Sequence, residues 1–324
     1  MLAGATSLVV SPTGPLLSVP FAVLLTGPAT AGDLAGAPWL IKQAAIAHVP
    51  SAANFVSLRK AGQSAGARPW FGFGGFRPVT LAQAEATFPA QACHDSAALF
   101  AGLPPLRSAL RELDAARQLL GAAPSDEMLD AAFTADAVLR ANLKPYRILH
   151  FATHGLLPAE LLCESEPAIV TSAPTGAPNA DGALLKASAI VGLDLDADLI
   201  ILSACNSGGP GGSTAGESLS GLARAFFYAG TRTLLVTHWS VNDQAAAFLV
   251  ADTLRRLRTA PNEGVAAAMR GAELGMLAAA GHDLPAEIAH PFFWAPFAVI
   301  GEPNVAGGRT AAAALTPAPD PAAM

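Results

Sequence analysis

Three apolar runs of strand length dominate the second half of the chain. They lie at residues 147–153, 198–203 and 231–237, and a shorter run at 297–300 follows them. Segments with helical or loop character separate these runs. Strands this apolar have no solvated face, which is typical of a parallel sheet covered by helices on both sides. The pattern therefore predicts an α/β fold with a mostly parallel sheet.

Two amphipathic helices are expected before the first of these runs. Residues 105–120 repeat leucine at helical spacing, with Arg and Glu between, and Gly121 is a typical helix end. A second helix is expected over residues 126–139, with acidic side chains in its first turn.

The later helices carry capping signals. Thr214 and Glu217 form a capping-box pattern before an apolar stripe, and Gly230 ends that helix. Ser240 and Asp243 repeat the pattern before the next predicted helix. Both helices therefore have a defined start in the sequence.

The first half of the chain is less regular. Apolar runs at 7–10 and 20–25 predict two short strands, and residues 52–60 predict a helix. Residues 61–80 are rich in Gly, Pro and aromatic residues, so we expect a loop there. Arg77 stands where a dinucleotide fingerprint needs its third glycine, and this excludes a nucleotide site.

Composition narrows the class of protein. The 324 residues suffice for about two domains, and hydrophobic residues make up 52% against 14% charged. No apolar stretch has the length of a membrane-spanning helix. The net charge of −6 and the scattered basic residues argue against nucleic-acid binding. We therefore expect neither a membrane nor nucleic acid as a partner.

Cysteine usage predicts a reducing compartment. The chain has three cysteines, and an odd number argues against a disulfide framework. Cys93 and Cys163 are interpreted as inert core residues. The uncharged amino-terminal segment lacks the basic start of a secretory signal, and prolines interrupt it. Together these features predict a cytoplasmic protein.

Residues able to do chemistry stand where two strands end. His154 and Gly155 follow the run 147–153, and Cys205 follows the run 198–203. Because ligands bind at the carboxyl ends of parallel strands, these residues are expected to meet in one crevice. An imidazole within hydrogen-bond reach can deprotonate a thiol, whose pKa is otherwise ~8.5. His154 is therefore the candidate base and Cys205 the candidate nucleophile.

Other readings of these positions remain open. The N–H groups of Gly155 and Cys205 would form an oxyanion hole, although a cysteine at a strand end is often inert core. His238 ends the run 231–237 and is either a second candidate base or a polar residue at the cleft rim. His150 is interpreted as an interior histidine. Cysteine and histidine pairs at metal spacing are missing from the sequence, so we expect neither a metal nor another cofactor.

Six segments of the chain carry a specific set of motifs. They include ILHFATHG at 148–155, ADLIILSACNSG at 197–208 and HPFFWAPFAVIG at 290–301, together with residues 181–190, 221–230 and 239–243. As a set and in this order they resemble the CHAT domain family, relatives of caspases and separase. The resemblance implies a caspase-like three-layer sandwich and a cysteine endopeptidase acting on protein substrates. By it, His154 is the catalytic base and Cys205 the nucleophile, at an interval close to the ~50 residues seen in caspases.

The resemblance also implies a division of the chain. Residues 1–120 are similar to the family's degenerate, pseudo-protease-like part, and 121–143 form a linking helix. Residues 144–302 correspond to the caspase-like peptidase domain. The Ala- and Pro-rich residues 303–324 are expected to be a disordered tail.

A substrate pocket is suggested by the same resemblance. Asp243 matches an aspartate of separase-like relatives that lies in the pocket for the residue before the cut, where it would pair with Arg or Lys. Trp239 and His238 would border this pocket, although the family usually has a small or aliphatic residue at the place of His238. Asp243 also fits a purely structural capping role.

Two further expectations concern partners. CHAT domains usually follow helical TPR repeats, and no 34-residue period is present in this chain. By the resemblance, such repeats would belong either to a longer protein of which this sequence is a part or to a TPR-containing regulatory partner. The alternative to an enzyme is a catalytically silent CHAT scaffold that binds a peptide or a protein.

Overall fold

The computed structural model describes residues 4–93, 95–156, 158, 161, 163–205, 215–239 and 241–304. Within these ranges a ten-stranded sheet runs in the order β1-β2-β10-β9-β8-β5-β3-β4, and β6 and β7 extend it from β5. The strands are β1 Ser7–Val10, β2 Ala45–His48, β3 Arg68–Gly74, β4 Glu127–Leu129, β5 Tyr146–Leu156, β6 Ala168–Val170, β7 Leu184–Lys186, β8 Ala197–Cys205, β9 Thr231–Thr237 and β10 Phe297–Gly301.

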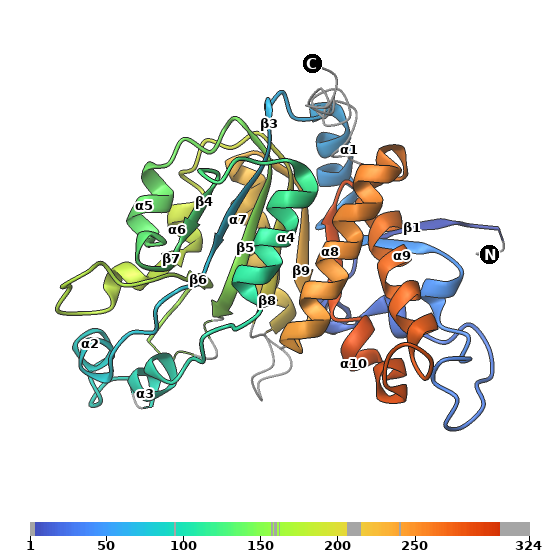
Figure 1. Cartoon of the computed structure of the whole chain (residues 1–324), viewed down its shortest axis with the longest axis horizontal. Helices are drawn as coiled ribbons and strands as arrows, with labels where there is room; N and C mark the ends of the chain where they lie inside the picture. The colour runs from blue at the N-terminus through green and yellow to red at the C-terminus, as the bar shows by residue number, and fades with distance from the viewer. Residues whose placement is uncertain are drawn as a thin grey trace, which may run out of the picture.

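Helices cover both faces of this sheet. They are α1 Ala52–Ala61, α2 Leu81–Thr87, α3 Ser96–Ala101, α4 Ala109–Leu120, α5 Ala135–Arg140, α6 Ala187–Ile190, α7 Ala215–Ala229, α8 Asp243–Thr259, α9 Gly264–Ala279 and α10 Pro291–Trp294. Figure 1 shows α4, α8 and α9 side by side over one face. One hydrophobic core lies under these helices, and a second lies between the opposite face and α5, α6 and α7.

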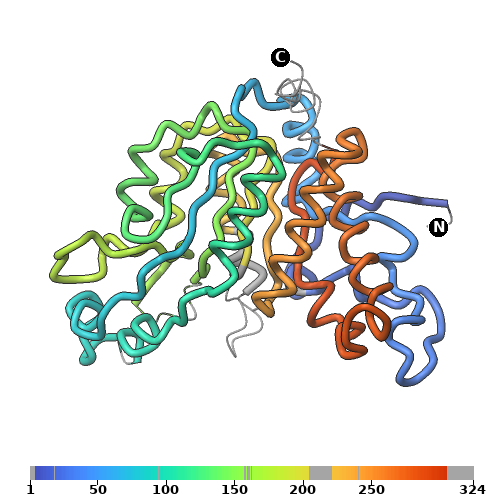
Figure 2. The backbone as a smooth tube through the Cα atoms, viewed as in Figure 1, coloured from blue at the N-terminus to red at the C-terminus, as the bar shows by residue number. Residues whose placement is uncertain are grey.

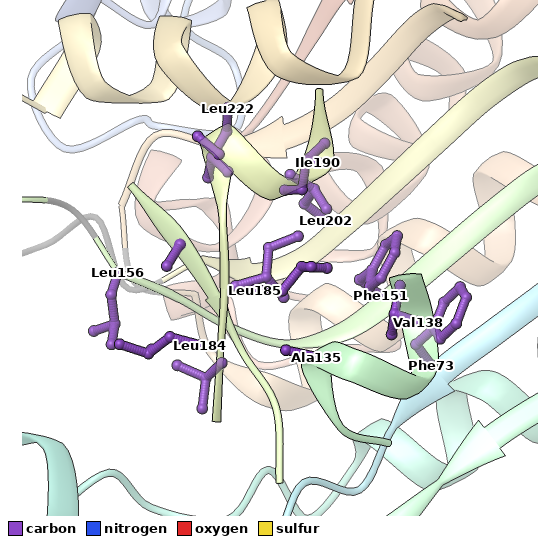
Figure 3. Close-up of a cluster of buried hydrophobic side chains, with 14 of the residues drawn as sticks. Phe73, Ala135, Val138, Phe151, Leu156, Leu184, Leu185, Ile190, Leu202 and Leu222 are labelled. Atoms are coloured by element: carbon purple, nitrogen blue, oxygen red, sulfur yellow. The ribbon is translucent and has the colours of Figure 1, made fainter. Parts of the chain in front are cut away.

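The central strands follow the apolar runs of the sequence. β3, β5, β8 and β9 are parallel neighbours, whereas β10 is antiparallel to β9. Every residue of β5 and of β9 is buried. Figure 3 shows how side chains of β5 and β8, among them Phe151 and Leu202, pack with Val138 of α5, Ile190 of α6 and Leu222 of α7. The predicted three-layer α/β architecture with a mostly parallel sheet is confirmed.

The expectation that residues 61–80 form a loop is wrong in part. β3 lies within them and pairs with β5 and β4. The aromatic residues of β3 are buried in both cores. Gly72 leaves room for an indole: a Cβ atom there would lie 2.2 Å from the Trp70 ring. The glycine and aromatic content therefore reflects close packing inside the sheet.

Two other expected elements are also wrong. Residues 20–25 form the 3₁₀ turn Phe21–Val23, and Pro20 before it has no N–H to donate to a ladder. The helix expected over 126–139 is reduced to α5, because β4 joins the sheet beside β3. Asp126 fixes this strand's start, since its carboxylate accepts hydrogen bonds from the Tyr146 hydroxyl and the Ala123 N–H.

Strands of the expected amino-terminal part lie at both edges of the one sheet. β2 lies beside β10 with β1 beyond it at one edge, and β3 lies on the other side of β5, next to the edge strand β4. Figure 2 shows the amino-terminal chain in blue crossing from one edge of the sheet to the other. The division at residues 120 and 144 therefore stays a prediction about ancestry, and residues 305–324 of the expected tail lie outside the described ranges.

Cys93 and Cys163 form a disulfide bond, with their Cα atoms 5.5 Å apart. The expectation that both are inert core residues is therefore wrong. An odd number of cysteines is compatible with one disulfide bond and one further cysteine. A disulfide is typical of oxidising compartments, so the cytoplasmic prediction loses this support and stays a prediction. Among the helices in the described part of the chain, none combines the length and hydropathy needed to cross a membrane.

Candidate active site

The backbone of Cys205 lies beside that of Gly155. The two residues are Cα partners at the end of the parallel pair of β5 and β8. The preceding partners are Ala152 and Ser203, so β5 holds one residue more than β8 between the two pairs. Such a bulge re-aims the side chains within it, and His154 is in this bulge. The pairing brings the backbone of the residue after His154 beside that of Cys205, and the expectation that the two side chains meet in one crevice stays a prediction.

The ring of His154 is held by its neighbours. Its Nε2 lies 2.8 Å from the carbonyl oxygen of Pro104, and the Phe76 ring meets it edge to face at 5.4 Å. A carbonyl oxygen only accepts, so Nε2 carries the proton. In the neutral ring, Nδ1 therefore keeps its lone pair. The hydrogen bond to Pro104 favours this tautomer, and His154 is only 6% exposed.

Burial lowers the pKa of His154 below its usual 6.5. The hydrogen bond to Pro104 and the negative charge of Asp243 raise the pKa, but they do not reverse the effect of burial. The ring is therefore neutral near pH 7, which is the form that a general base needs.

Asp243 lies at the start of α8, and its negative charge raises the pKa of His154. The helix cap is Asn242, whose side chain accepts from the N–H groups of Gln244 and Ala245. The predicted capping box from Ser240 to Asp243 is therefore wrong, and Ser240 itself lies outside the described residues. Freed from capping its own helix, Asp243 accepts a 2.7 Å hydrogen bond from the Ser108 N–H. This bond links the start of α8 to the start of α4.

His238 and Trp239 lie together but face other partners. The His238 ring meets His48 edge to face at 6.0 Å and stacks on Trp239 at 6.1 Å. Trp239 donates its indole N–H to the Phe292 carbonyl oxygen. Burial, followed by the charge of His48, lowers the pKa of His238 to about 3. None of these contacts involves His154. Of the residues predicted for the pocket, Asp243 acts on the pKa of His154, whereas the His238 ring faces His48 of β2.

A buried network that the sequence analysis did not single out lies under the candidate site. Glu112 of α4 accepts hydrogen bonds on Oε1 from His150 Nε2 at 2.7 Å and from the Ser203 hydroxyl at 2.6 Å. All three side chains are buried, which confirms His150 as an interior histidine. The network ties α4 to β5 and β8 shortly before His154 and Cys205.

The sequence carried a signal for one of the missed residues only. Glu112 shares a helical face with Leu113 and Ala116, and an acid on such a face implies a buried partner. Pro104 acts through its backbone carbonyl, which no side-chain pattern reveals. In the described ranges, no cluster of three or more His, Cys, Asp or Glu side chains is arranged to hold a metal ion.

The chain is thus an α/β sandwich domain whose parallel strands β5 and β8 end side by side at Gly155 and Cys205. Comparison with known proteins gives its family. The CHAT domain family matches residues 2–302. The chain belongs to the CHAT domain family. A search of curated proteins found no match.

Among solved structures, the chain is similar to the Arg-specific cysteine proteinase gingipain R (RgpB). The identity is 9% and the TM-score is 0.49. The similarity covers 88% of this chain and 60% of that chain.

Proposed function

We propose that this chain is a cysteine endopeptidase in which His154 and Cys205 form the catalytic dyad. The observation that carries the proposal is the pairing of Gly155 with Cys205, which puts the residue after the candidate base beside the candidate nucleophile. Membership of the CHAT family, relatives of caspases and separase, supports the same reaction.

The proposed reaction uses the neutral tautomer of His154. Nδ1 takes the proton of the Cys205 thiol, and the thiolate attacks the substrate's peptide carbonyl. The N–H groups of Gly155 and Cys205 stabilise the oxyanion of the tetrahedral intermediate. The imidazolium then gives its proton to the leaving amine, and a thioester remains. Water, deprotonated by His154, hydrolyses the thioester and restores the thiol.

The proposed substrate carries Arg or Lys before the cut. Asp243 supplies the negative charge for it, and one of its oxygens is held by the Ser108 N–H. Trp239 borders the pocket in this proposal, whereas the His238 ring faces His48 of β2 and is left out of it. A helical TPR-containing protein is the proposed regulatory partner, because the family usually joins such repeats to its CHAT domain.

The competing function is a silent scaffold that binds a peptide without cutting it. The two functions separate in one experiment on the full chain: peptides with Arg, Lys or Ala before the scissile bond are incubated with the wild type and with Cys205→Ala. The proposal predicts cleavage after Arg or Lys by the wild type alone. Peptide binding without products in both proteins supports the scaffold instead.

A further inference from the structure

A cavity of about 220 Å³ lies away from the contacts of His154, beside the junction of β2 and β10. β2 pairs with β10 at one position, His48 with Ile300. Thr13, Gly14 and Leu17 of the amino-terminal segment line it, and so do Ala223 and Arg224 of α7.

The walls of the cavity are mostly apolar. Leu17, Val49, Ala298 and Ile300 line it, together with prolines of the amino-terminal segment. An engineered cavity of ~150 Å³ with apolar walls binds benzene. The larger volume here has room for a body of that size and a small polar group beside it.

Positive charge and imidazole groups mark one class of ligand. Arg224 is the charged residue among the lining side chains, and it is exposed. His48 and His238 also line the cavity, and both ring nitrogens of His48 are buried without a hydrogen bond of normal geometry. Burial lowers the pKa of His48 to about 4, against a smaller opposing contribution from the Val299 backbone. Both rings are therefore neutral, and the positive charge at the cavity comes from Arg224.

We propose that this cavity is a binding site for a small carboxylic acid with an apolar body, such as an aryl or short-chain aliphatic carboxylate. Its carboxylate pairs with Arg224, and its body lies against Leu17 and Ile300. A single negative charge matches a single guanidinium, whereas a doubly charged phosphate would leave charge uncompensated against apolar walls.

Two elements that line the cavity also connect it with the candidate active site. Ala223 and Arg224 belong to α7, the helix that follows Cys205 in the chain, and His238 directly precedes Trp239. Figure 1 shows α7 behind the sheet, next to the strands that carry the dyad. The binding proposal itself does not depend on peptidase activity.

The test is isothermal titration calorimetry on the full chain with 3-phenylpropionate and hexanoate. The matched neutral probes are 3-phenylpropanol and 1-hexanol. We expect the acids to bind, and Arg224→Gln to weaken them roughly tenfold or more, the effect of one charge-assisted hydrogen bond. The alcohols bind Arg224→Gln as they bind the wild type. Lys60→Gln, which removes an exposed cation that does not line the cavity, leaves acid binding unchanged.

A second pair of variants tests the location. Leu17→Trp fills the cavity and is expected to abolish binding, whereas Leu16→Trp, at an exposed neighbour outside the lining, keeps it. Equal affinity for the acids and the alcohols overturns the proposal, and so does an absence of acid binding or an affinity that Leu17→Trp leaves unchanged.

Discussion

The Nε2 atom of His154 lies 2.8 Å from the carbonyl oxygen of Pro104, in the segment that leads into α4. The same helix is tied to α8 through Ser108 and Asp243 and to β5 and β8 through Glu112. The tautomer of the candidate base is therefore set by the position of α4. A partner that shifts this helix would change the base without touching it.

The pH dependence of activity tests the environment of His154. Because burial lowers its pKa, the acid limb of kcat/KM is expected below pH 6.5. Asp243→Asn removes a negative charge that raises this pKa, so the limb moves to still lower pH. The measurement uses two fluorogenic peptides, one with Arg and one with Ala before the cut. A shift of the acid limb is expected with both peptides, whereas a loss of Arg binding lowers kcat/KM for the Arg peptide only.

The control for this measurement is Asp114→Asn, at an exposed acid paired with Arg117 on α4. It leaves the limb in place. A wild-type limb at or above pH 6.5, or an upward shift in Asp243→Asn, contradicts the account.

Acid is expected to destabilise the fold through His48 and His238. Their folded-state pKa values are about 4 and about 3, below the ordinary 6.5 of an unfolded chain. Between these values the unfolded state binds more protons, so stability falls as the pH decreases from 6.5. Each ring contributes up to about 1.4 kcal/mol per pH unit in this window. Urea unfolding of the wild type and His48→Asn at several pH values measures the slope.

His48→Asn removes one of the two titrating rings and is expected to flatten this slope. The matched control is His282→Asn, at an exposed histidine, and its slope equals that of the wild type. A pH-independent free energy of unfolding between pH 6.5 and 4 would refute this role of the buried pair.

The buried network of Glu112 is expected to dominate the stability of α4. Glu112→Ala leaves the His150 N–H and the Ser203 hydroxyl without their acceptor, at a cost of about 1–3 kcal/mol each. Glu112→Gln keeps an acceptor oxygen and loses less. Urea unfolding measures both, and Glu85→Ala on the exposed face of α2 stays within about 0.5 kcal/mol of the wild type. Equal losses for Glu112→Ala and Glu85→Ala are incompatible with the network.

The disulfide predicts the number of reactive thiols. In denaturant without reductant, one of the three cysteines is expected to react with a thiol reagent, and three after reduction. The bond closes a separation of 70 residues, and its removal costs about 4 kcal/mol by the chain-entropy account. Cys93→Ala/Cys163→Ala is therefore less stable and insensitive to reductant. Three reactive thiols before reduction would show that the bond is absent.

The elements that the sequence predicts well are those whose pattern has one physical cause. The fully buried β5 and β9 have continuous apolar sequences because helices cover both faces of the sheet. α4 ends at Gly121, whose positive φ of 66° suits glycine. β3 was missed because Gly72, read as a loop residue, serves to accommodate Trp70.

The candidate site also has features that the sequence predicts and features that it does not. Strand ends mark His154 and Cys205 as candidate site residues, since topology brings the ends of parallel strands to one edge. The role of Pro104 depends on a backbone carbonyl, and the disulfide depends on bringing Cys93 to Cys163 through the fold. Neither is encoded in a local pattern.

The most direct test of the central claim is mass spectrometry of the cleavage products of a defined peptide mixture, with wild-type protein and Cys205→Ala compared at equal concentration. A peptide electrophile with Arg at its reactive end is added in parallel to trap the thiol. We predict products from the wild type alone and a covalent adduct on Cys205. Cleavage that persists in Cys205→Ala would contradict the proposed dyad, and so would a wild type that forms the adduct but cuts no peptide.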